Sequence, residues 1–572
     1  MSPGLADNRR HRWPGAVFNL SCMVGERRGV WDMGLTRARA VLLGLLMSAS
    51  LAVQAPAADW PQWGGRNQRN FASDEKGIPA TFSPGGEKTE GDQKVSVPPE
   101  NIKWVAKLGS QTYGNPTVSG GKVFIATNDA CLNDPPRLKK TGGGLIMCLD
   151  EATGKLLWQL PVPRLKTKDS NFNYDNFNLG VCSSPCVDGD RVYVVSNRGE
   201  VLCLDVNGQA NGNDGPFMDE GQYMAGTADL PGKPGRFDKS AAPPLPPPVE
   251  VKPTDGDILW VYDFLVEVDS WPQDAVDCSV LVHGDYVYVC VSNGVDKSHR
   301  KIPSPNCPDL IVLDKKTGKL VAVNDPPIGN AIFHGEWSSP CLAEVGGKPL
   351  VVWGGGDGWC YAFDPVPEPG EGGKPGKLKT VWTFDCNPPH NKVRDGRPLP
   401  YNKNREGPSE IIGTPVFYKD RIYVTVGQDS RHGNGPGCLS CIDPAKTGDI
   451  TDTGKVWQCF DVQRSFSTVS GYEGLIFVAD YAGIVQCMDA DTGQVYWKHD
   501  LGAHVWGSTF AVDGKVLIGD EKGKVTVLAA AKEKKVLHEA KFGVPVYTTP
   551  IVANGVLYIA SQTHLYAIQA PK

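Results

Sequence analysis

Short runs of alternating apolar and polar residues recur along most of the chain. Each run opens with small polar residues or proline, turns at Asp-Gly or Gly-Gly, and continues into β-branched and aromatic residues with a period of two. This period is typical of β-strands that bury one face. The second strand of each pair begins near Val123, Val192, Val287, Leu350, Ile422, Ile476, Val516 and Leu557. The sequence therefore predicts an array of eight repeats built from antiparallel strands.

A second motif follows the strand pairs. A third strand ends at Asp, a Thr-Gly turn comes next, and a fourth strand carries Trp, most clearly in residues 149–158 and 488–497. The glycine supplies the positive φ that a tight turn needs. Each Trp is expected to dock between neighbouring repeats, because a large planar ring fills the gap between twisted sheets. These residues are Trp158, Trp260, Trp382, Trp457 and Trp497. Four strands per repeat predict the blades of a β-propeller.

The two ends of the chain predict how the ring closes. The last repeat supplies only three strands, whereas residues 101–109 form an isolated strand that carries Trp104. We expect this strand to complete the last blade, because closure removes exposed edges. The predicted fold is all-β, an eight-bladed β-propeller over residues 101–572. Residues 58–100 form a leading segment, and a Pro/Gly-rich insertion occupies about 206–257.

Residues 1–57 differ from the repeats. Two arginines precede the apolar run Ala40–Leu51, and the small-residue site Ala55-Pro56-Ala57 follows it. This order predicts a secretory signal peptide over about 33–57, cleaved after that site and preceded by an overlong start. An anchor helix is the alternative, but the run is shorter than the roughly 18 residues that span a bilayer. We expect an exported protein, periplasmic or extracellular, without a membrane span in its mature part.

Composition and charge exclude some classes of protein. The chain has 572 residues, with 58 basic and 64 acidic side chains and a net charge of −6. A nucleic-acid-binding surface would be basic, so no nucleic acid is expected as a partner. With 40% hydrophobic residues the chain is not disordered. We expect a monomer.

Four of the sixteen cysteines share one position of the repeat. Cys148, Cys203, Cys441 and Cys487 each stand two residues before an Asp. A small apolar side chain at a repeated strand position is typical of a buried free cysteine. A disulfide between loop cysteines remains an alternative. The lone CxxC at Cys438 and Cys441 lacks the second ligand pair of a metal site.

The Asp-x-x-Thr-Gly-x-x-x-Trp motif around a predicted eight-bladed ring resembles the PQQ (pyrrolo-quinoline quinone) repeat family. The resemblance covers about residues 101–572 and implies the propeller fold. That family contains quinoprotein alcohol and sugar dehydrogenases, and also non-catalytic propellers such as the lipoprotein of the outer-membrane β-barrel assembly machine. A fold of this kind hosts many activities, so the resemblance leaves the function open.

The resemblance implies that a dehydrogenase would hold PQQ with Ca²⁺ and use an Asp as general base. No adjacent cysteine pair and no CxxCH haem motif occur in the sequence. No catalytic residue of the family can therefore be placed on this chain, and no cofactor is assigned. We expect an exported, non-catalytic propeller that serves as a binding or assembly scaffold. The alternative is a PQQ-dependent dehydrogenase with calcium and an atypical site.

Long loops favour one rim of the ring as the binding face for a protein or carbohydrate partner. They are residues 128–144, 161–180, 292–309, 387–409 and 427–437. Loops on a rigid scaffold often carry function, although simple tolerance of insertions is the alternative. Ten residues that enter the innermost strands from this rim are expected at the channel mouth. The candidates for catalysis are Asp277, Glu336 and Glu410, and those for binding are Tyr113, Asp274, His334, Trp337, Arg464, His504 and Trp506.

One oxygen-rich stretch remains as a weak candidate metal site. It contains Asp205, Asn207, Asn211, Asn213 and Asp214. Its spacing departs from the calcium loop of an EF-hand, which ends in a Glu. A turn-rich insertion is the alternative that we favour.

Overall fold

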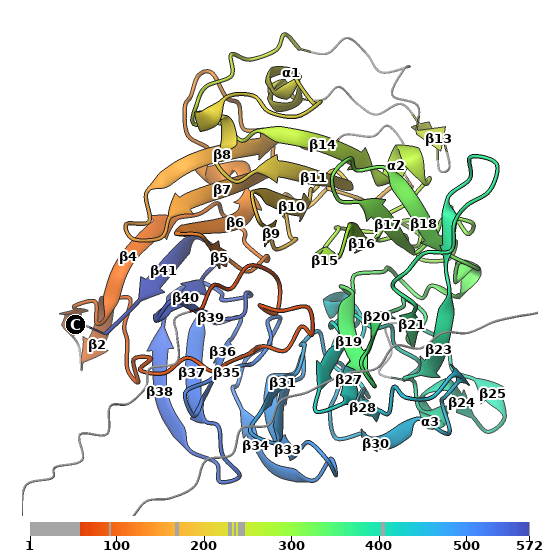
Figure 1. Ribbon diagram of the computed structural model, residues 1–572. Helices are drawn as coiled ribbons and strands as arrows, with labels where there is room; N and C mark the ends of the chain where they lie inside the picture. The colour runs from red at the N-terminus through yellow and green to blue at the C-terminus, as the bar shows by residue number, and fades with distance from the viewer. Residues whose placement is uncertain are drawn as a thin grey trace, which may run out of the picture. The chain divides into compact units, whose positions relative to one another are not determined.

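The computed structural model describes residues 58–90, 93–165, 171–226, 232–233, 236–237, 246–401 and 406–570. The predicted signal peptide and its cleavage site lie outside these residues. These residues contain forty-one strands and a few short helices, and most of the strands form eight blades around a central axis (Figure 1). No helix in the described parts of the chain is long and apolar enough to cross a membrane.

Each blade contains four antiparallel strands. They follow one another in chain order from the axis outward, except in blade 8, where β4 from the N-terminal side of the chain is outermost. Blade 1 contains β5 (Thr117–Ser119), β6 (Lys122–Asn128), β7 (Gly144–Asp150) and β8 (Leu156–Val162). Blade 2 contains β9 (Cys186–Asp188), β10 (Arg191–Val195), β11 (Glu200–Asp205) and β14 (Ile258–Asp263). Blade 3 contains β15 (Leu281–His283), β16 (Tyr286–Cys290), β17 (Leu310–Asp314) and β18 (Leu320–Asn324), with β22 (Gly376–Leu378) at its outer edge. Blade 4 contains β19 (Cys341–Val345), β20 (Lys348–Gly354), β21 (Trp359–Phe363) and β23 (Thr380–Asp385), with β29 (Gly448–Asp449) outside.

The second half of the ring repeats this order. Blade 5 contains β26 (Val416–Tyr418), β27 (Arg421–Val426), β28 (Cys438–Ile442) and β30 (Lys455–Cys459). Blade 6 contains β31 (Ser470–Tyr472), β32 (Leu475–Ala479), β33 (Ile484–Asp489) and β34 (Val495–Asp500). Blade 7 contains β35 (Phe510–Val512), β36 (Lys515–Gly519), β37 (Lys524–Ala529) and β38 (Val536–Lys541). Blade 8 contains β39 (Ile551–Ala553), β40 (Val556–Ala560), β41 (His564–Ile568) and β4 (Ile102–Lys107).

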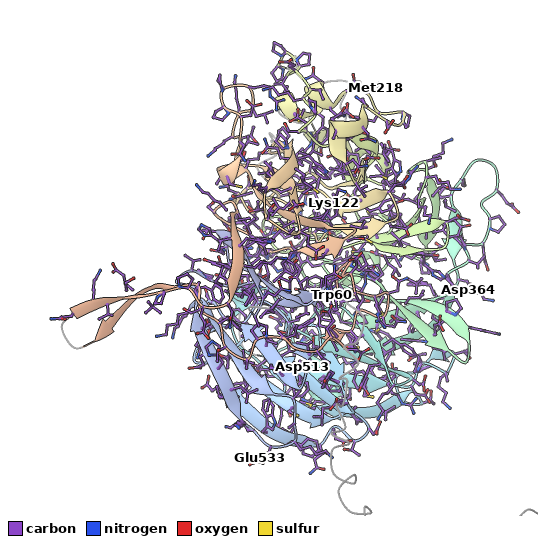
Figure 2. All side chains as sticks on the ribbon, turned by 60° about the vertical axis from the view of Figure 1, so that its left-hand side comes forward. Trp60, Lys122, Met218, Asp364, Asp513 and Glu533 are labelled. Atoms are coloured by element: carbon purple, nitrogen blue, oxygen red, sulfur yellow. The ribbon has the colours of Figure 1, made fainter. Side chains whose placement is uncertain are left out.

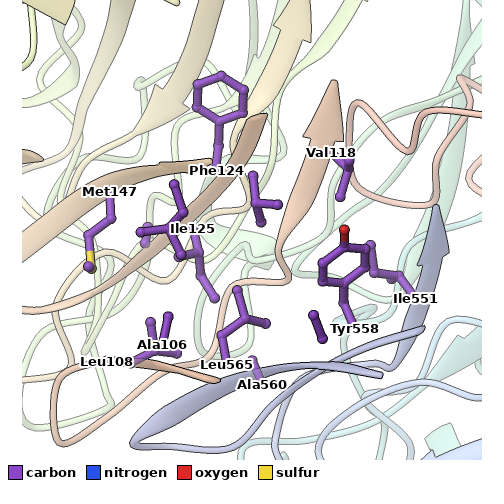
Figure 3. Packing of buried hydrophobic residues seen from close by; sticks show 14 of the residues in the cluster. Ala106, Leu108, Val118, Phe124, Ile125, Met147, Ile551, Tyr558, Ala560 and Leu565 are labelled. Atoms are coloured by element: carbon purple, nitrogen blue, oxygen red, sulfur yellow. The ribbon is translucent and has the colours of Figure 1, made fainter. Parts of the chain in front are cut away.

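Blade 8 confirms the predicted closure of the ring. Strand β4 pairs antiparallel with β41, so that Val105 lies opposite Tyr566 and Lys107 opposite His564. The N-terminal strand therefore completes a sheet whose other three strands come from the end of the chain. Figure 3 shows the apolar packing at this junction, where Ala106 and Leu565 of blade 8 lie near Ile125 of blade 1.

Smaller elements decorate the blades. They are α1 (Glu220–Ala225), α2 (Phe264–Glu267), α3 (Pro389–Lys392) and the 3-10 turns η1 (Asp129–Cys131), η2 (Gly208–Asn211), η4 (Gly329–Ala331) and η5 (Ser430–His432). Strands β2 (Gly86–Glu90) and β3 (Gln93–Val97) form a hairpin that projects from the propeller (Figure 2). Two further two-stranded hairpins pair β12 (Gly232–Lys233) with β13 (Arg236–Phe237) and β24 (Val393–Arg394) with β25 (Arg397–Pro398).

Five fourth-strand tryptophans donate a hydrogen bond to the next blade, in agreement with the predicted docking. Trp382 of blade 4 packs in an apolar cluster that includes blade 5 residues, but its indole N–H has no hydrogen-bond partner among the described residues. Trp457 of blade 5 donates its indole N–H to the Ala490 carbonyl in blade 6, at 3.1 Å. The turn glycine of that blade, Gly493, has φ of 72°, and a Cβ there would lie 2.7 Å from the Trp457 ring. The motif therefore needs glycine for its backbone conformation and also for the close approach of the preceding blade. Trp104, Trp158, Trp260 and Trp497 make the same contact with the next blade, at 2.8–3.3 Å.

The described cysteines are packing residues. All fifteen are free, and fourteen of them are buried. Cys148, Cys203, Cys441 and Cys487 occupy third strands of their blades, which confirms the predicted position in the repeat.

A belt of hydrogen bonds runs around the inner ends of the blades. One hydroxyl or amide residue stands two positions before each innermost strand, and the backbone N–H of one blade donates to the side chain of the next. Seven such bonds measure 2.8–3.0 Å. The belt residues are Asn115, Ser184, Ser279, Ser339, Thr414, Thr468, Ser508 and Thr549. The belt fixes the spacing of the blades at the axis.

The leading segment closes one end of the ring. Residues 58–73 make hydrogen bonds to the innermost strand of every blade or to the turn beside that strand. The contacts begin with Ala58 on blade 8 and end with β1 (Ala72–Ser73), which pairs parallel with β35 of blade 7. Innermost strands present an edge with unpaired backbone groups, and this segment satisfies several of them. The segment crosses the middle of the ring in Figure 1.

Arg69 holds the leading segment in place. Its side chain is fully buried, and its guanidinium donates to the carbonyls of Pro340, Val280 and Trp63 and to the amide oxygen of Gln62, at 2.6–3.1 Å. Burial lowers the pKa of Arg69 to about 10, so the group stays charged at neutral pH.

We expect the Arg69→Met substitution to lower the free energy of unfolding by about 3 kcal/mol or more, because a hydrogen bond to a charged group contributes about 1.5–3 kcal/mol. Chemical denaturation measures the change. Arg66→Met is the matched control, since Arg66 is exposed. Equal stability of the two variants would contradict the assigned role of Arg69.

Candidate ligand-binding site

Eight residues, one from each blade, line the wall of the central channel. Each stands four positions before the first residue of its innermost strand and two positions before its belt residue. They are Tyr113, Cys182, Asp277, Trp337, Ile412, Phe466, Trp506 and Tyr547. The belt therefore fixes where these side chains lie, and we call this set the wall ring.

The wall ring surrounds a cavity of about 500 Å³. Trp63 of the leading segment lines its inner end and donates its indole N–H to the hydroxyl of the belt residue Thr414, at 3.0 Å. Phe177 and Arg431, from two of the long rim loops, line the other end. The leading segment thus forms the floor of the cavity, and the decorated rim surrounds its mouth.

One half of the cavity is aromatic. Phe466, Trp506, Tyr547 and Tyr113 come from blades 6, 7, 8 and 1 and form a continuous arc. Successive ring centroids are 5.5, 5.1 and 5.5 Å apart, and the two tyrosine rings are stacked with an interplanar angle of 16°. Aromatic faces of this kind bind a planar or apolar part of a ligand.

The other half carries charge. Asp274, Asp277 and Asp429 line it together with one cation, Arg431. Arg431 forms ion pairs with Asp274 and Asp429, the latter at 3.3 Å, and lies over the Phe177 ring. Three carboxylates against one guanidinium leave an excess of negative charge.

Asp277 faces the cavity without an ion pair among the described residues. The protein around the cavity disfavours the charged form and raises the pKa of Asp277 to about 6, and a hydrogen bond with the Cys182 thiol partly offsets this effect. Its charge therefore depends on pH between about 5 and 7.

The structure brings five of the ten predicted mouth residues to this cavity: Tyr113, Asp274, Asp277, Trp337 and Trp506. His334 lies just behind it, with Nε2 3.9 Å from Asp274 Oδ2. His504 stacks on Tyr481 at 4.4 Å, outside the lining. Arg464 is buried and donates to the carbonyls of His432 and Gly433, at 3.0 and 3.3 Å.

Glu336 and Glu410 do not line the cavity. Both are fully buried. Burial and, next to it, the charge of the neighbouring Asp309 carboxylate raise the pKa of Glu336 well above its ordinary value. Glu410 accepts hydrogen bonds from Tyr401 Oη at 3.1 Å and from the Gly335 N–H at 3.3 Å, and burial raises its pKa as well.

The oxygen-rich stretch in blade 2 uses its polar groups internally. Asp205 accepts from the Asn207 N–H at 2.7 Å, and Asn211 donates to Asp214 at 2.8 Å. Asn213 donates to Glu220 at 2.8 Å. These bonds fit a turn-rich insertion, which lies between β11 and β14 and in part outside the described residues.

Sequence reasoning missed several lining residues. Phe466 and Tyr547 stand at the same repeat position as Tyr113 and Trp506, so alignment of the eight repeats could have found them. Trp63, Asp429 and Arg431 lie outside the repeat, and their place at the cavity depends on how the leading segment and a rim loop fold.

The fold and this cavity define an eight-bladed propeller with a central pocket, one end of which is covered by its own leading segment. A family model described as outer membrane protein assembly factor BamB matches residues 481–571, which contain the last two strands of blade 6, all of blade 7 and three of the four strands of blade 8. Residues 481–571 thus carry a PQQ-like β-propeller repeat. No curated protein matches the sequence.

The solved structures to which the chain is similar have low sequence identity. BamB from Moraxella catarrhalis is 14% identical with a TM-score of 0.45, over 81% of this chain and 96% of that chain. The computationally designed Ika8 protein is 12% identical with a TM-score of 0.43, over 82% and 100%. Quinohemoprotein alcohol dehydrogenase from Comamonas testosteroni is 15% identical with a TM-score of 0.41, over 91% and 82%.

The raised pKa of Asp277 gives a test of its environment. The folded protein holds a proton on Asp277 up to pH about 6, whereas an unfolded Asp loses it near pH 4. Stability from this group is therefore present at low pH and is lost as the pH rises through about 6. We therefore expect the free energy of unfolding of Asp277→Asn, measured by urea denaturation, to increase relative to that of the wild type as the pH is raised from 5 to 7. Asp452→Asn, an exposed acid, should show no such trend.

Proposed function

We propose that this propeller is an exported, non-catalytic binding protein that takes a small ligand with an apolar ring and a cationic or hydrogen-bond-donating end. The observation that supports this most directly is the division of the wall ring. The aromatic arc of blades 6, 7, 8 and 1 faces carboxylates on the opposite side of the same cavity. An aromatic surface and an excess of acid suit a ring and a cation respectively.

The floor of the cavity also supports binding. Trp63 is tied to Thr414, and Arg69 anchors the same segment, so the cavity is built before a ligand arrives. A pre-formed site loses less conformational entropy when it binds. A scaffold role at the decorated rim, with a protein or carbohydrate partner, belongs to the same proposal, because rim residues Phe177 and Arg431 line the mouth of the cavity.

The residues of the cavity do not fit PQQ. The cofactor is itself an anion with several carboxylates, whereas the lining carries three carboxylates and a single guanidinium that already contacts two of them. Glu336 and Glu410, which an atypical dehydrogenase site would need, are buried away from the lining. We therefore derive no oxidation step on this chain.

Two small probes with the same ring and opposite charge test the proposal. We expect phenethylamine to quench the fluorescence of the cavity tryptophans Trp63, Trp337 and Trp506 at concentrations at least tenfold lower than phenylacetate. Asp277→Asn should reduce this preference, and wild-type binding of the amine should weaken below pH 6, where Asp277 is protonated. Asp452→Asn is the control.

Two results would contradict the proposal. Equal binding of the two probes would remove the role of the carboxylates. Stoichiometric binding of PQQ with Ca²⁺, together with turnover of alcohols or aldoses in a dye-linked assay, would establish the alternative of a dehydrogenase.

Export has its own test. The mature protein recovered from cells is expected to begin near Ala58, because the apolar run and small-residue site of residues 33–57 direct cleavage there. N-terminal sequencing decides the point. An intact Met1 on cytoplasmic protein would contradict export and leave the ligand proposal standing.

A further inference from the structure

Three histidines from three separate loops meet beside the cavity. His299 lies in the loop between β16 and β17, His334 precedes β19, and His432 ends η5. The His334 ring centroid is 4.6 Å from that of His299 and 5.5 Å from that of His432. One ring nitrogen of each residue lies within 4.8 Å of the other two. The fold thus brings three histidines that are far apart in sequence close enough to bind one metal ion.

His334 is the buried member of this cluster. Its side chain is 0% exposed, and neither ring nitrogen has a hydrogen-bond partner among the described residues. A buried polar group without a partner costs about 1–3 kcal/mol. The backbone of His334 is held by Val295, whose N–H donates to its carbonyl at 2.9 Å. An imidazole that is fixed, buried and without a hydrogen-bond partner beside two other histidines is a candidate metal ligand.

The tautomer of His432 is set by its neighbour. Gln428 Nε2 donates to the Pro408 carbonyl at 2.7 Å, which leaves Gln428 Oε1 to face His432 Nδ1 at 3.1 Å. An amide oxygen only accepts, so Nδ1 of His432 carries the hydrogen and Nε2 carries the lone pair. Metal-binding histidines commonly donate their second N–H to a carbonyl or carboxylate in this way.

Carboxylates complete the surroundings of the cluster. Asp274, His334 and Asp429 also have ligand atoms within 4.8 Å of one another. The backbone of Asp274 has a φ of 63°, a conformation that is uncommon outside glycine and that fixes the direction of its side chain. Imidazole nitrogens with nearby carboxylates suit zinc and neighbouring transition metals, whereas calcium prefers oxygen ligands alone.

We propose that His299, His334 and His432 bind a divalent transition-metal ion of the zinc class at the rim of the channel. Asp274 and Asp429, which also pair with Arg431, lie close enough to supply a further ligand. Zinc takes nitrogen ligands at about 2.0–2.1 Å, so a modest movement of the rings toward one another completes the site. His299 is exposed on a loop and can supply that movement. This site goes beyond the proposed function, because it requires no organic ligand.

Calorimetric titration of the chelator-stripped full chain with ZnCl₂ tests the proposal. We expect one zinc ion per chain, and at least tenfold weaker binding for His299→Ala, which removes a ligand from an exposed position without disturbing the core. CoCl₂ should give a visible absorption band that this variant lacks. CaCl₂ should not compete. His504→Ala is the matched control, since His504 also lies on the rim but outside the cluster.

His334→Gln should weaken zinc binding further, and circular dichroism shows whether that variant is folded. Unchanged zinc affinity in His299→Ala would overturn the proposal, as would equal loss in His504→Ala or the absence of a cobalt band in the wild type. Zinc binding is measured without a chelator, and phenethylamine binding is measured in EDTA. A negative result for the zinc site therefore does not affect the test of the proposed function, and the reverse also holds.

Discussion

The belt of hydrogen bonds around the axis is the interaction on which the rest of the structure depends. Each bond joins the backbone N–H of one blade to a hydroxyl or amide of the next, so the eight inner strands are fixed at a common spacing. Tryptophan contacts farther out, such as that of Trp457 with the Ala490 carbonyl, join the same pairs of blades at a larger radius. Two concentric sets of contacts therefore join five of the eight pairs of neighbouring blades.

The belt also explains where the cavity lies and what forms it. A wall-ring residue stands two positions before each belt residue, so any side chain at that position faces the axis. Blades differ in what they place there, from the aromatic Trp506 to the acidic Asp277. The leading segment then bonds to the inner strands and provides a floor at Trp63. The eight blades thus keep the same strand arrangement, while the different side chains at the wall-ring position give the cavity an aromatic half and an acidic half.

Much of the fold could be predicted from local sequence, because the same strand and turn patterns occur in each repeat. The eight strand pairs, the docking of tryptophans such as Trp158 and the closure by residues 101–109 each rest on short-range patterns or on counting strands. The site was harder to predict. Tyr113 and Asp277 stand at a fixed position of the repeat, so their place at the channel could be predicted. Arg431 lies in a long rim loop and reaches the cavity only through the conformation of that loop. Loop conformation has no period, so the sequence carries little sign of it.

Glu336 shows a different limit of prediction. It stands one residue before the wall-ring residue Trp337, and at the level of sequence the two are equivalent candidates. Backbone alternation turns Glu336 away from the axis toward Asp309, where burial and the neighbouring carboxylate favour a neutral acid.

Solvent access thus separates two kinds of acid near the channel. Asp277 faces the cavity and changes its charge near pH 6, while Glu336 and Glu410 are fully buried and their pKa values are raised well above the ordinary range. Charge is therefore retained where a ligand can meet it and suppressed where it would only weaken the core. The division between binding surface and scaffold is set by which way each backbone position points, and the belt determines that direction.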